Sequence, residues 1–217
     1  LNNEKVGANF YNFIKSNSIN NSTFINENFS EVLKKNKNFL NEFFHGVELK
    51  SYKFDKYKTK KDNDKYEFDV LSKVKLLNLN EVKRYKSLIE GTNFTKDLVS
   101  EPGNILHPDE YAKRLVNLRK LGLKVVVYDT KKLRKLGMNA LLGVGQGSVR
   151  GSYLVTIEWN GLRKKNKPLA FVGKGVCFDT GGISLKPAKF MEDMTYDMAG
   201  SAVVVGLMKN LALRKAK

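Results

Sequence analysis

Lysines and aspartates gather with glycines near the C-terminal end of the chain. Residues 171–187 read FVGKGVCFDTGGISLKP and contain Lys174, Asp179 and Lys186, and Asp197 opens the next predicted helix. Carboxylates that converge with lysines in a cleft suit hard divalent cations and an anionic intermediate. Glycine is costly within helices and strands, so four of them between residues 173 and 182 indicate backbone that bends sharply or lies close to a ligand. The pattern is therefore consistent with a metal-dependent site.

The same residues also fit a purely structural interpretation. Asp179 could be a turn residue and Asp197 a helix N-cap, with the two lysines as their solvated partners. Residue types and spacing alone do not separate this interpretation from a metal site.

Cys177, the single cysteine, invites a different chemistry. A cysteine nucleophile needs a histidine partner, and the only histidines are His45 and His107, neither within a supporting motif. We therefore interpret Cys177 as a small space-filling residue between the candidate ligands. One cysteine also excludes a disulfide framework and favours a reducing compartment.

A second glycine-rich stretch, residues 143–147 (GVGQG), could be taken for a phosphate-binding loop. It lacks the full dinucleotide fingerprint, and a predicted strand follows it where a helix is required. We expect a structural loop near the metal site instead.

The elements that would position the candidate site alternate between helix and strand. We expect helices over residues 108–122, 130–136 and 197–213, with Gly122 and Gly137 ending the first two, and buried strands over residues 123–128, 153–159 and 168–172. This order is typical of an α/β fold with a parallel or mixed sheet flanked by helices. The candidate site then begins where a strand ends, which is where open α/β sheets bind ligands.

The N-terminal part of the chain has a different pattern of apolar and charged residues. Apolar residues at three- and four-residue steps predict one amphipathic helix over residues 29–46, with Ser30 as N-cap and Gly46 as its stop. A charged turn is expected at residues 58–67. An edge strand is expected over residues 68–79, with one face made by Val70, Val74 and Leu76.

A helix over residues 80–98 would link two domains. The predicted organisation is therefore the C-terminal part of an N-terminal domain (1–79), a linking helix (80–98) and the N-terminal part of a catalytic domain (99–217).

The amino-acid composition restricts the classes of protein to which the chain can belong. Hydrophobic residues at 41% and charged residues at 28% are typical of globular chains. No apolar run approaches the roughly 18 residues of a membrane-spanning helix, so we expect no membrane insertion. The opening residues do not follow the plan of a signal peptide.

The net charge of +17 would attract phosphate, which makes nucleic-acid binding one hypothesis for the function. The lysines, however, are spread along the whole chain, with only short clusters such as residues 58–61 and 163–165. No RNA-binding sheet motif or zinc-finger spacing accompanies them. We interpret the charge as a general overuse of lysine, and nucleic acid stays an alternative partner.

Residues 171–187 resemble the signature of peptidase family M17, the leucyl aminopeptidases or cytosol aminopeptidases, which is close to VGKGVTFDSGGISLKP. The resemblance extends to residues 97–104 (DLVSEPGN) and 137–148 (GMNALLGVGQGS), and residues 51–60 are similar to the end of the family's N-terminal domain. It therefore runs from about residue 49 to the last residue. Cys177 departs from the usual Thr and Ala199 from a usual Gly.

The resemblance implies roles for four residues. Lys174, Asp179 and Asp197 would be ligands of two divalent cations, Mn²⁺ or Zn²⁺, and Lys186 would be the catalytic lysine beside the scissile carbonyl. Lys174 can ligate a cation only as a neutral amine, whereas Lys186 must stay protonated to stabilise an oxyanion. One cation would also hold the free amino group of the substrate, which explains exopeptidase action.

The resemblance also implies peptide substrates with free N-termini, a homo-hexamer when full length, and a cytoplasmic location without membrane attachment. The family's second acidic pair lies in an NTDAEGR element downstream of the lysine signature, and no such element occurs before Lys217. Two dications would bring four positive charges against two carboxylates, those of Asp179 and Asp197. We therefore expect an internal fragment of a longer enzyme, inactive alone. The alternatives are a DNA-binding member of the family and an inactive split-gene remnant.

Overall fold

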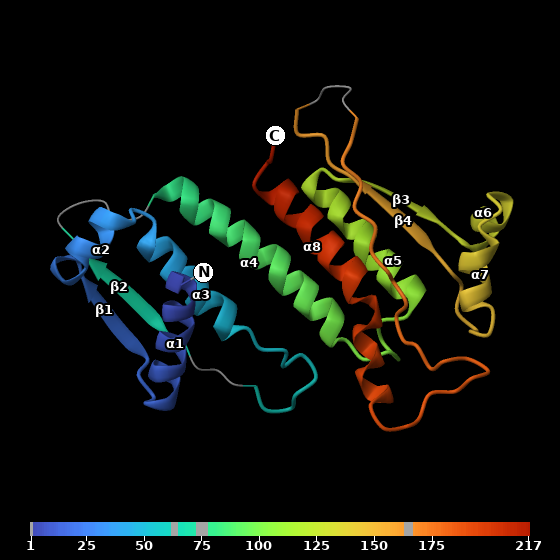
Figure 1. The fold of residues 1–217 in the computed structure, drawn as a ribbon, viewed down its shortest axis with the longest axis horizontal. Helices are drawn as coiled ribbons and strands as arrows, with labels where there is room; N and C mark the ends of the chain where they lie inside the picture. The colour runs from blue at the N-terminus through green and yellow to red at the C-terminus, as the bar shows by residue number, and fades with distance from the viewer. Residues whose placement is uncertain (1, 62–64, 73–77, 163–166) are drawn as a thin grey trace. The chain divides into compact units, whose positions relative to one another are not determined.

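The computed structural model describes residues 2–61, 65–72, 78–162 and 167–217 (Figure 1). The chain forms two compact units, the N-terminal unit Leu1–Ile89 and the C-terminal unit Glu90–Lys217. Each unit has its own hydrophobic core. The predicted α/β class is confirmed, because strands and flanking helices occur in both units.

The N-terminal unit pairs two short strands beside two long helices. Strands β1 (Asn21–Ile25) and β2 (Glu67–Leu71) run parallel, with Phe24 opposite Val70. Helices α1 (Asn2–Ser16) and α3 (Phe39–Ser51) supply the apolar faces that cover the core. The core is largely aromatic, with ring centroids 5.3 to 6.2 Å apart around Phe24. Its rings come from Phe10, Phe24, Phe29, Phe43, Phe44 and Phe68.

The single helix predicted over residues 29–46 is wrong. A short 3₁₀ turn, η1 (Asn26–Phe29), leads into α2 (Ser30–Lys35), and α3 begins only at Phe39. The chain breaks at Asn36, which is extended and accepts a hydrogen bond from the Asn38 amide at 2.9 Å. Such a local side-chain bond competes with helix continuation. Ser30 is the first residue of α2 and makes no capping bond; its hydroxyl bonds to the Glu27 carbonyl.

Gly46 does not stop a helix but lies within α3, where α3 crosses α1. A Cβ on Gly46 would lie 1.9 Å from the Glu4 carbonyl oxygen, and a Cβ on Gly7 would lie 1.9 Å from that of Phe43. Glycine is therefore required because the two helix backbones approach without side chains between them. The helix continues to Ser51.

The edge strand predicted over residues 68–79 is found in its first part, as β2. Val74 and Leu76 lie outside the described residues. Residues 58–61 are exposed, as expected for the charged turn, whereas residues 62–64 are not among those described. The parallel partner β1 was not predicted from the sequence. Helix α4 (Leu79–Ser100) occupies the position of the predicted linking helix.

The C-terminal unit follows the predicted order of elements up to residue 159, apart from one additional helix over residues 139–145 that was not predicted. Helix α5 (Pro108–Val116) and the 3₁₀ turn η2 (Asn117–Leu121) end at Gly122, which has a φ of +86°. The remaining elements are β3 (Lys124–Tyr128), α6 (Thr130–Lys135), α7 (Asn139–Gly145), β4 (Leu154–Glu158), η3 (Met191–Met198) and α8 (Ala199–Leu213). Strands β3 and β4 pair antiparallel, with Val126 opposite Thr156.

Two local predictions for this unit need correction. Residues 168–172 form no strand and pair with no described strand, and the side chains of Leu169 and Val172 are 88% and 96% exposed. An apolar run becomes a strand only where a neighbour satisfies its backbone groups. Gly143 and Gly145 lie in the last turn of α7 rather than in a loop.

Helix α8 forms one wall of the C-terminal core, as its small and aliphatic residues predict. Met198, Ala202 and Val205 are buried in a cluster that also contains Leu98 and Leu106. Figure 1 shows α8 (red) running alongside α5. Among the described residues, no helix combines the length and apolar character needed to cross a membrane.

Candidate metal centre and active site

The candidate site is built where an extended segment crosses the N-terminus of α8. The Ser201 amide donates a hydrogen bond to the Lys174 carbonyl at 2.9 Å. A Cβ on Gly173 would lie only 2.4 Å from the Ser201 Cα, and one on Gly200 would lie 3.3 Å from the Lys174 amide nitrogen. Gly173 and Gly200 therefore permit a close approach of two backbones, whereas the sequence had predicted sharp bends or a nearby ligand for the glycines between residues 173 and 182.

The four predicted residues lie in two ion pairs. The Nζ of Lys174 lies 2.6 Å from Oδ1 of Asp197, and the Nζ of Lys186 lies 3.0 Å from Oδ2 of Asp179. Asp197, through a hydrogen bond, and then Asp179, through its charge, raise the pKa of Lys174. The two pairs therefore share one electrostatic environment.

Asp179 is fixed by the turn that follows it. The Gly181 amide donates to Oδ1 of Asp179 at 2.8 Å, and Gly181 and Gly182 have φ values of +90° and +71°. This amide and then Lys186 lower the pKa of Asp179, so the side chain is a carboxylate at neutral pH. Asp179 is thus a turn residue as well as a candidate ligand, and its Oδ2 stays directed at Lys186.

Asp197 is not a helix N-cap. It lies in η3, one residue before Met198, which caps α8 without a side-chain bond. Its Oδ2 is buried and finds no hydrogen-bond partner in the part of the chain that the structure describes, while Oδ1 accepts the bond from Lys174. An unpaired carboxylate oxygen is costly to bury.

The donor set fits a divalent cation. A cation beside Lys174 and Asp197 would satisfy the unpaired oxygen, and Asp179 would add a second hard ligand. The described residues contain no group of three His, Cys, Asp or Glu side chains placed to bind a metal. A cation at this place would therefore need the Lys174 amine as a further ligand. The pKa of Lys174 is raised here, because its partner is the Asp197 carboxylate; a nearby dication would favour the neutral amine instead.

The environment of Lys186 includes a residue that the sequence did not single out. Its Nζ lies 3.0 Å from Sδ of Met194 and is half-buried. Met194 belongs to η3, the same turn that carries Asp197. No local sequence signal pointed to this contact, because it depends on how the loop over residues 180–190 folds back.

Cys177 is buried in the core beside the candidate ligands. Its Sγ lies 3.7 Å from the Gly175 carbonyl oxygen, and burial raises the pKa of the thiol to about 11. A thiol with this pKa is protonated at neutral pH and is a poor nucleophile. Among the described contacts, neither His107 nor His45 bonds to it: their Nδ1 atoms face Asp109 and Glu4.

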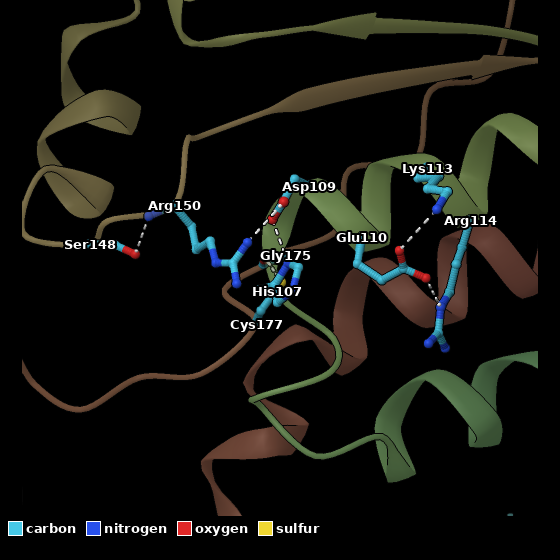
Figure 2. A network of polar contacts seen from close by, with 9 residues as sticks. All are labelled: His107, Asp109, Glu110, Lys113, Arg114, Ser148, Arg150, Gly175 and Cys177. Carbon is cyan, nitrogen blue, oxygen red and sulfur yellow. Dashed lines mark hydrogen bonds and ion pairs between the residues drawn. The ribbon is translucent and has the colours of Figure 1, made fainter.

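A polar network that was not predicted from the sequence lies beside the segment that contains Gly175 and Cys177 (Figure 2). Asp109 bonds to His107 and forms an ion pair with Arg150 at 3.2 Å. Glu110, on the same helix, faces Arg114 at 3.1 Å, and this hydrogen bond lowers the pKa of Glu110. The i,i+4 spacing of the second pair was visible in the sequence; the contact with Arg150, 41 residues away from Asp109, was not.

Arg114 also reaches the loop that begins with Glu101. Its Nη1 lies 2.8 Å from Oε1 of Glu101, whose side chain is 2% exposed. The Glu101 carboxylate, in the middle of the DLVSEPGN element, therefore anchors that element to α5.

Residues 93–217 match the model of the cytosol aminopeptidase family, catalytic domain. The match covers more than half of the chain, and the chain therefore belongs to this family. The resemblance found in the sequence is confirmed. Neither the DNA-binding alternative nor the inactive remnant finds support in these comparisons.

Relatives from several bacteria agree with the family model. A protein of Afipia carboxidovorans and one of Bradyrhizobium sp. BTAi1, both described as "Probable cytosol aminopeptidase", are 52% and 49% identical over 177 and 176 residues. Each alignment covers 79% of this chain and 35% of the relative. The chain thus spans about a third of the length of the relatives it matches.

Solved structures share the fold. The cytosol aminopeptidase of Coxiella burnetii superposes with a TM-score of 0.70 at 26% identity, covering 81% of this chain and 36% of that one. The bottromycin maturation enzyme BotP in complex with Mn gives a TM-score of 0.67 at 29% identity over the same shares.

Proposed function

We propose that this chain is part of a metal-dependent leucyl aminopeptidase, which releases N-terminal residues from peptides. The family supports the reaction class. The observation that supports the mechanism is the buried Oδ2 of Asp197 beside Lys174, which has no hydrogen-bond partner among the described residues and would be satisfied by a bound cation.

Lys174, Asp179 and Asp197 would hold divalent cations in this proposal. Mn²⁺ or Zn²⁺ suits the donor set, and a related structure was solved with Mn. When bound, such ions polarise a carbonyl and lower the pKa of water. The residues of this chain would hold the two carboxylates in place. The Gly181 amide orients Asp179, and the contact with Lys174 orients Asp197.

Lys186 would act on the substrate as a cation. Its ammonium group is held at Asp179 and beside Met194, so it can donate a hydrogen bond to the scissile carbonyl and then to the oxyanion. An oxyanion donor that is fixed before the reaction stabilises charge without reorganisation of the site.

Further ligands would come from a longer enzyme. Two divalent cations carry four positive charges, whereas Asp179 and Asp197 supply only two negative ones. The matched part spans 35% of the relative's length, so the rest of a longer enzyme could supply the remaining ligands. Peptide substrates with free N-termini, a homo-hexamer and a cytoplasmic location belong to the same proposal, on the strength of the relatives' family. We expect little or no turnover from the 217 residues alone.

The test is Lys186→Ala in the whole enzyme. We expect kcat for a leucyl chromogenic substrate to fall by about 100- to 1,000-fold, the usual cost of removing one oxyanion donor. Bound metal, measured by elemental analysis, should not change. Lys189→Ala is the matched control, because Lys189 lies on the same loop and, among the described contacts, places its ammonium group over the Phe190 ring. Unchanged turnover in Lys186→Ala would refute the assigned role.

A further inference from the structure

A buried pair of hydroxyl groups lies behind the candidate metal site. Tyr111, on α5, is 6% exposed, and its Oη lies 3.0 Å from Oγ of Ser201, on α8. The Ser201 hydroxyl donates to the Met198 carbonyl at 2.8 Å. A serine hydroxyl has one proton, so the bond between the two hydroxyls must be donated by Tyr111.

Ser201 is also the residue that holds the backbone of Lys174. Its amide belongs to the first turn of α8, where amides lack partners within the helix. Since no side chain caps α8, the Lys174 carbonyl takes this role at 2.9 Å. The residue that carries the candidate ligand is therefore attached to the helix through Ser201.

Where the segment that contains Lys174 crosses the N-terminus of α8, the two backbones are in contact, with no side chains between them that could absorb a shift. Gly173 and Gly200 meet the opposite backbone directly, at the distances given above. Asp197 lies four residues before Ser201, near the end of η3, the 3₁₀ turn that leads into α8. A shift of Ser201 would therefore move the Lys174 carbonyl and change the separation of Lys174 from Asp197.

Tyr111 is suited to act as a permanent donor. Burial, assisted by the nearby Cys177 thiol, raises the pKa of Tyr111 to about 12. The hydroxyl is therefore protonated across the neutral range. Cys177 and Ser201 lie on the two segments that cross, so Tyr111 faces both.

We infer that Tyr111 and Ser201 are positioning residues of the candidate metal site. The Tyr111 hydroxyl fixes Ser201, the Ser201 amide fixes the main chain of Lys174, and this sets the Lys174 side chain beside Asp197. Neither residue touches substrate or metal in this arrangement. The link to metal binding rests on the proposed function; the hydrogen-bond chain itself does not.

The first measurement needs no metal and no substrate. Amide hydrogen exchange of the whole protein should show the Ser201 amide losing about fivefold in protection in Tyr111→Phe, the usual net effect of one hydrogen bond. Amides later in α8 should keep their protection. Unchanged exchange at Ser201 overturns the inference, whatever the activity of the protein.

The second measurement is the affinity of the metal-free protein for Mn²⁺, by titration calorimetry. We expect Tyr111→Phe to bind about fivefold more weakly. Tyr11→Phe is the matched control: Tyr11 is a tyrosine buried to a similar degree, in the core of the other unit, and should leave Mn²⁺ affinity unchanged. A loss of thermal stability equal in both variants, with equal Mn²⁺ affinity, overturns the positioning role.

Variants of Ser201 separate positioning from general damage. Ser201→Ala removes the acceptor, so adding Tyr111→Phe to it should cost nothing more. Ser201→Thr keeps the hydroxyl and should retain both exchange protection and affinity. A whole protein that shows these effects but releases no amino acids from peptides would refute the proposed function and leave the positioning inference standing.

Discussion

Gly103 and Phe178 illustrate how much a single atom can matter beside the site. A Cβ on Gly103 would lie 2.9 Å from Cδ2 of Phe178 and 3.2 Å from its Cβ. Phe178 directly precedes Asp179, and the loop of Gly103 is anchored by the buried Glu101 carboxylate. An added methyl group would therefore displace the ring, and with it the turn that aims Asp179.

We predict that Gly103→Ala weakens Mn²⁺ binding by about tenfold, which corresponds to the 1–3 kcal/mol of strain usual for overpacking. Titration calorimetry measures this. Gly143→Ala is the control, because no described atom beyond its neighbours and its own helix backbone lies within 4 Å of the added Cβ, and alanine favours the helix there. Removing the ring in Gly103→Ala/Phe178→Leu should restore most of the affinity; failure to do so, with a correctly folded variant, contradicts the steric explanation.

Glu110 gives a pH dependence whose sign follows from its partner. The hydrogen bond from Arg114 lowers the pKa of Glu110 below the value of about 4.3 expected in the unfolded chain. Between these two pKa values the unfolded state binds more protons, so stability rises with pH there. The contribution is complete above about pH 4.3 and is lost as the pH falls through the folded pKa.

We therefore predict that acid destabilises the C-terminal unit less steeply in Glu110→Gln than in the original protein. Urea unfolding between about pH 5 and pH 3 measures the slope. Glu192→Gln, on an exposed residue of η3, is the control and should leave the slope unchanged. Identical slopes for all three proteins would contradict the role of the Arg114 bond.

At the scale of elements, the crossing of α1 and α3 depends on backbone alone. An added Cβ on Gly46 would meet three backbone atoms of Glu4 between 1.9 and 2.7 Å. No flexible side chain can move aside, so α1 itself would have to shift.

We predict that Gly46→Ala destabilises the N-terminal unit by about 3 kcal/mol, at the upper end for overpacking. Alanine would stabilise an isolated helix, so propensity predicts the opposite sign. Thermal unfolding followed by circular dichroism distinguishes the two. Lys50→Ala, at an exposed position of α3, is the control and should change little.

The same glycine shows why some elements could be predicted and others not. Helix α5, the Gly122 cap, β3 and β4 carry local signals, namely a Pro in the first turn, a glycine in the left-handed region and uninterrupted apolar centres. Gly46 gives the same local signal as a helix stop, and only Glu4, 42 residues earlier, reveals its role. Residues 168–172 failed for the related reason that a strand needs a partner.

The candidate site divides in the same way. The resemblance to the family signature made Lys174, Asp179, Lys186 and Asp197 the candidates, because residue types and spacing alone left a structural interpretation open. Their pairing was not predictable, since the partner of Lys186 depends on a turn closed by the Gly181 amide. Tyr111 lies 90 residues from Ser201, beyond any local pattern.

At the scale of the whole molecule, each unit builds its core from its own residues. Leu40 is 1% exposed within the N-terminal core, and Leu106 is 2% exposed within the C-terminal core. The single tryptophan, Trp159, packs against the C-terminal core and donates to the Ala216 carbonyl at 2.7 Å. Its fluorescence therefore reports on one unit.

We predict that Leu40→Ala lowers stability by about 2–5 kcal/mol without moving the unfolding transition seen by Trp159 fluorescence. Leu106→Ala, the same truncation of a leucine side chain in the C-terminal core, should shift the unfolding transition that Trp159 fluorescence reports. Circular dichroism records both losses. A Trp159 transition that shifts equally in the two variants would show that the two units unfold as one.

The extended run over residues 168–172 also bears on how the polypeptide behaves at high concentration. Its apolar side chains are exposed, and it pairs with no strand that the structure describes. Exposed apolar side chains on backbone without a partner strand are the form in which one chain adds to another chain's sheet. A net charge of +17 opposes such self-association by mutual repulsion. Added salt screens that repulsion, so the 217-residue chain should aggregate as ionic strength rises, with this run as the point of contact.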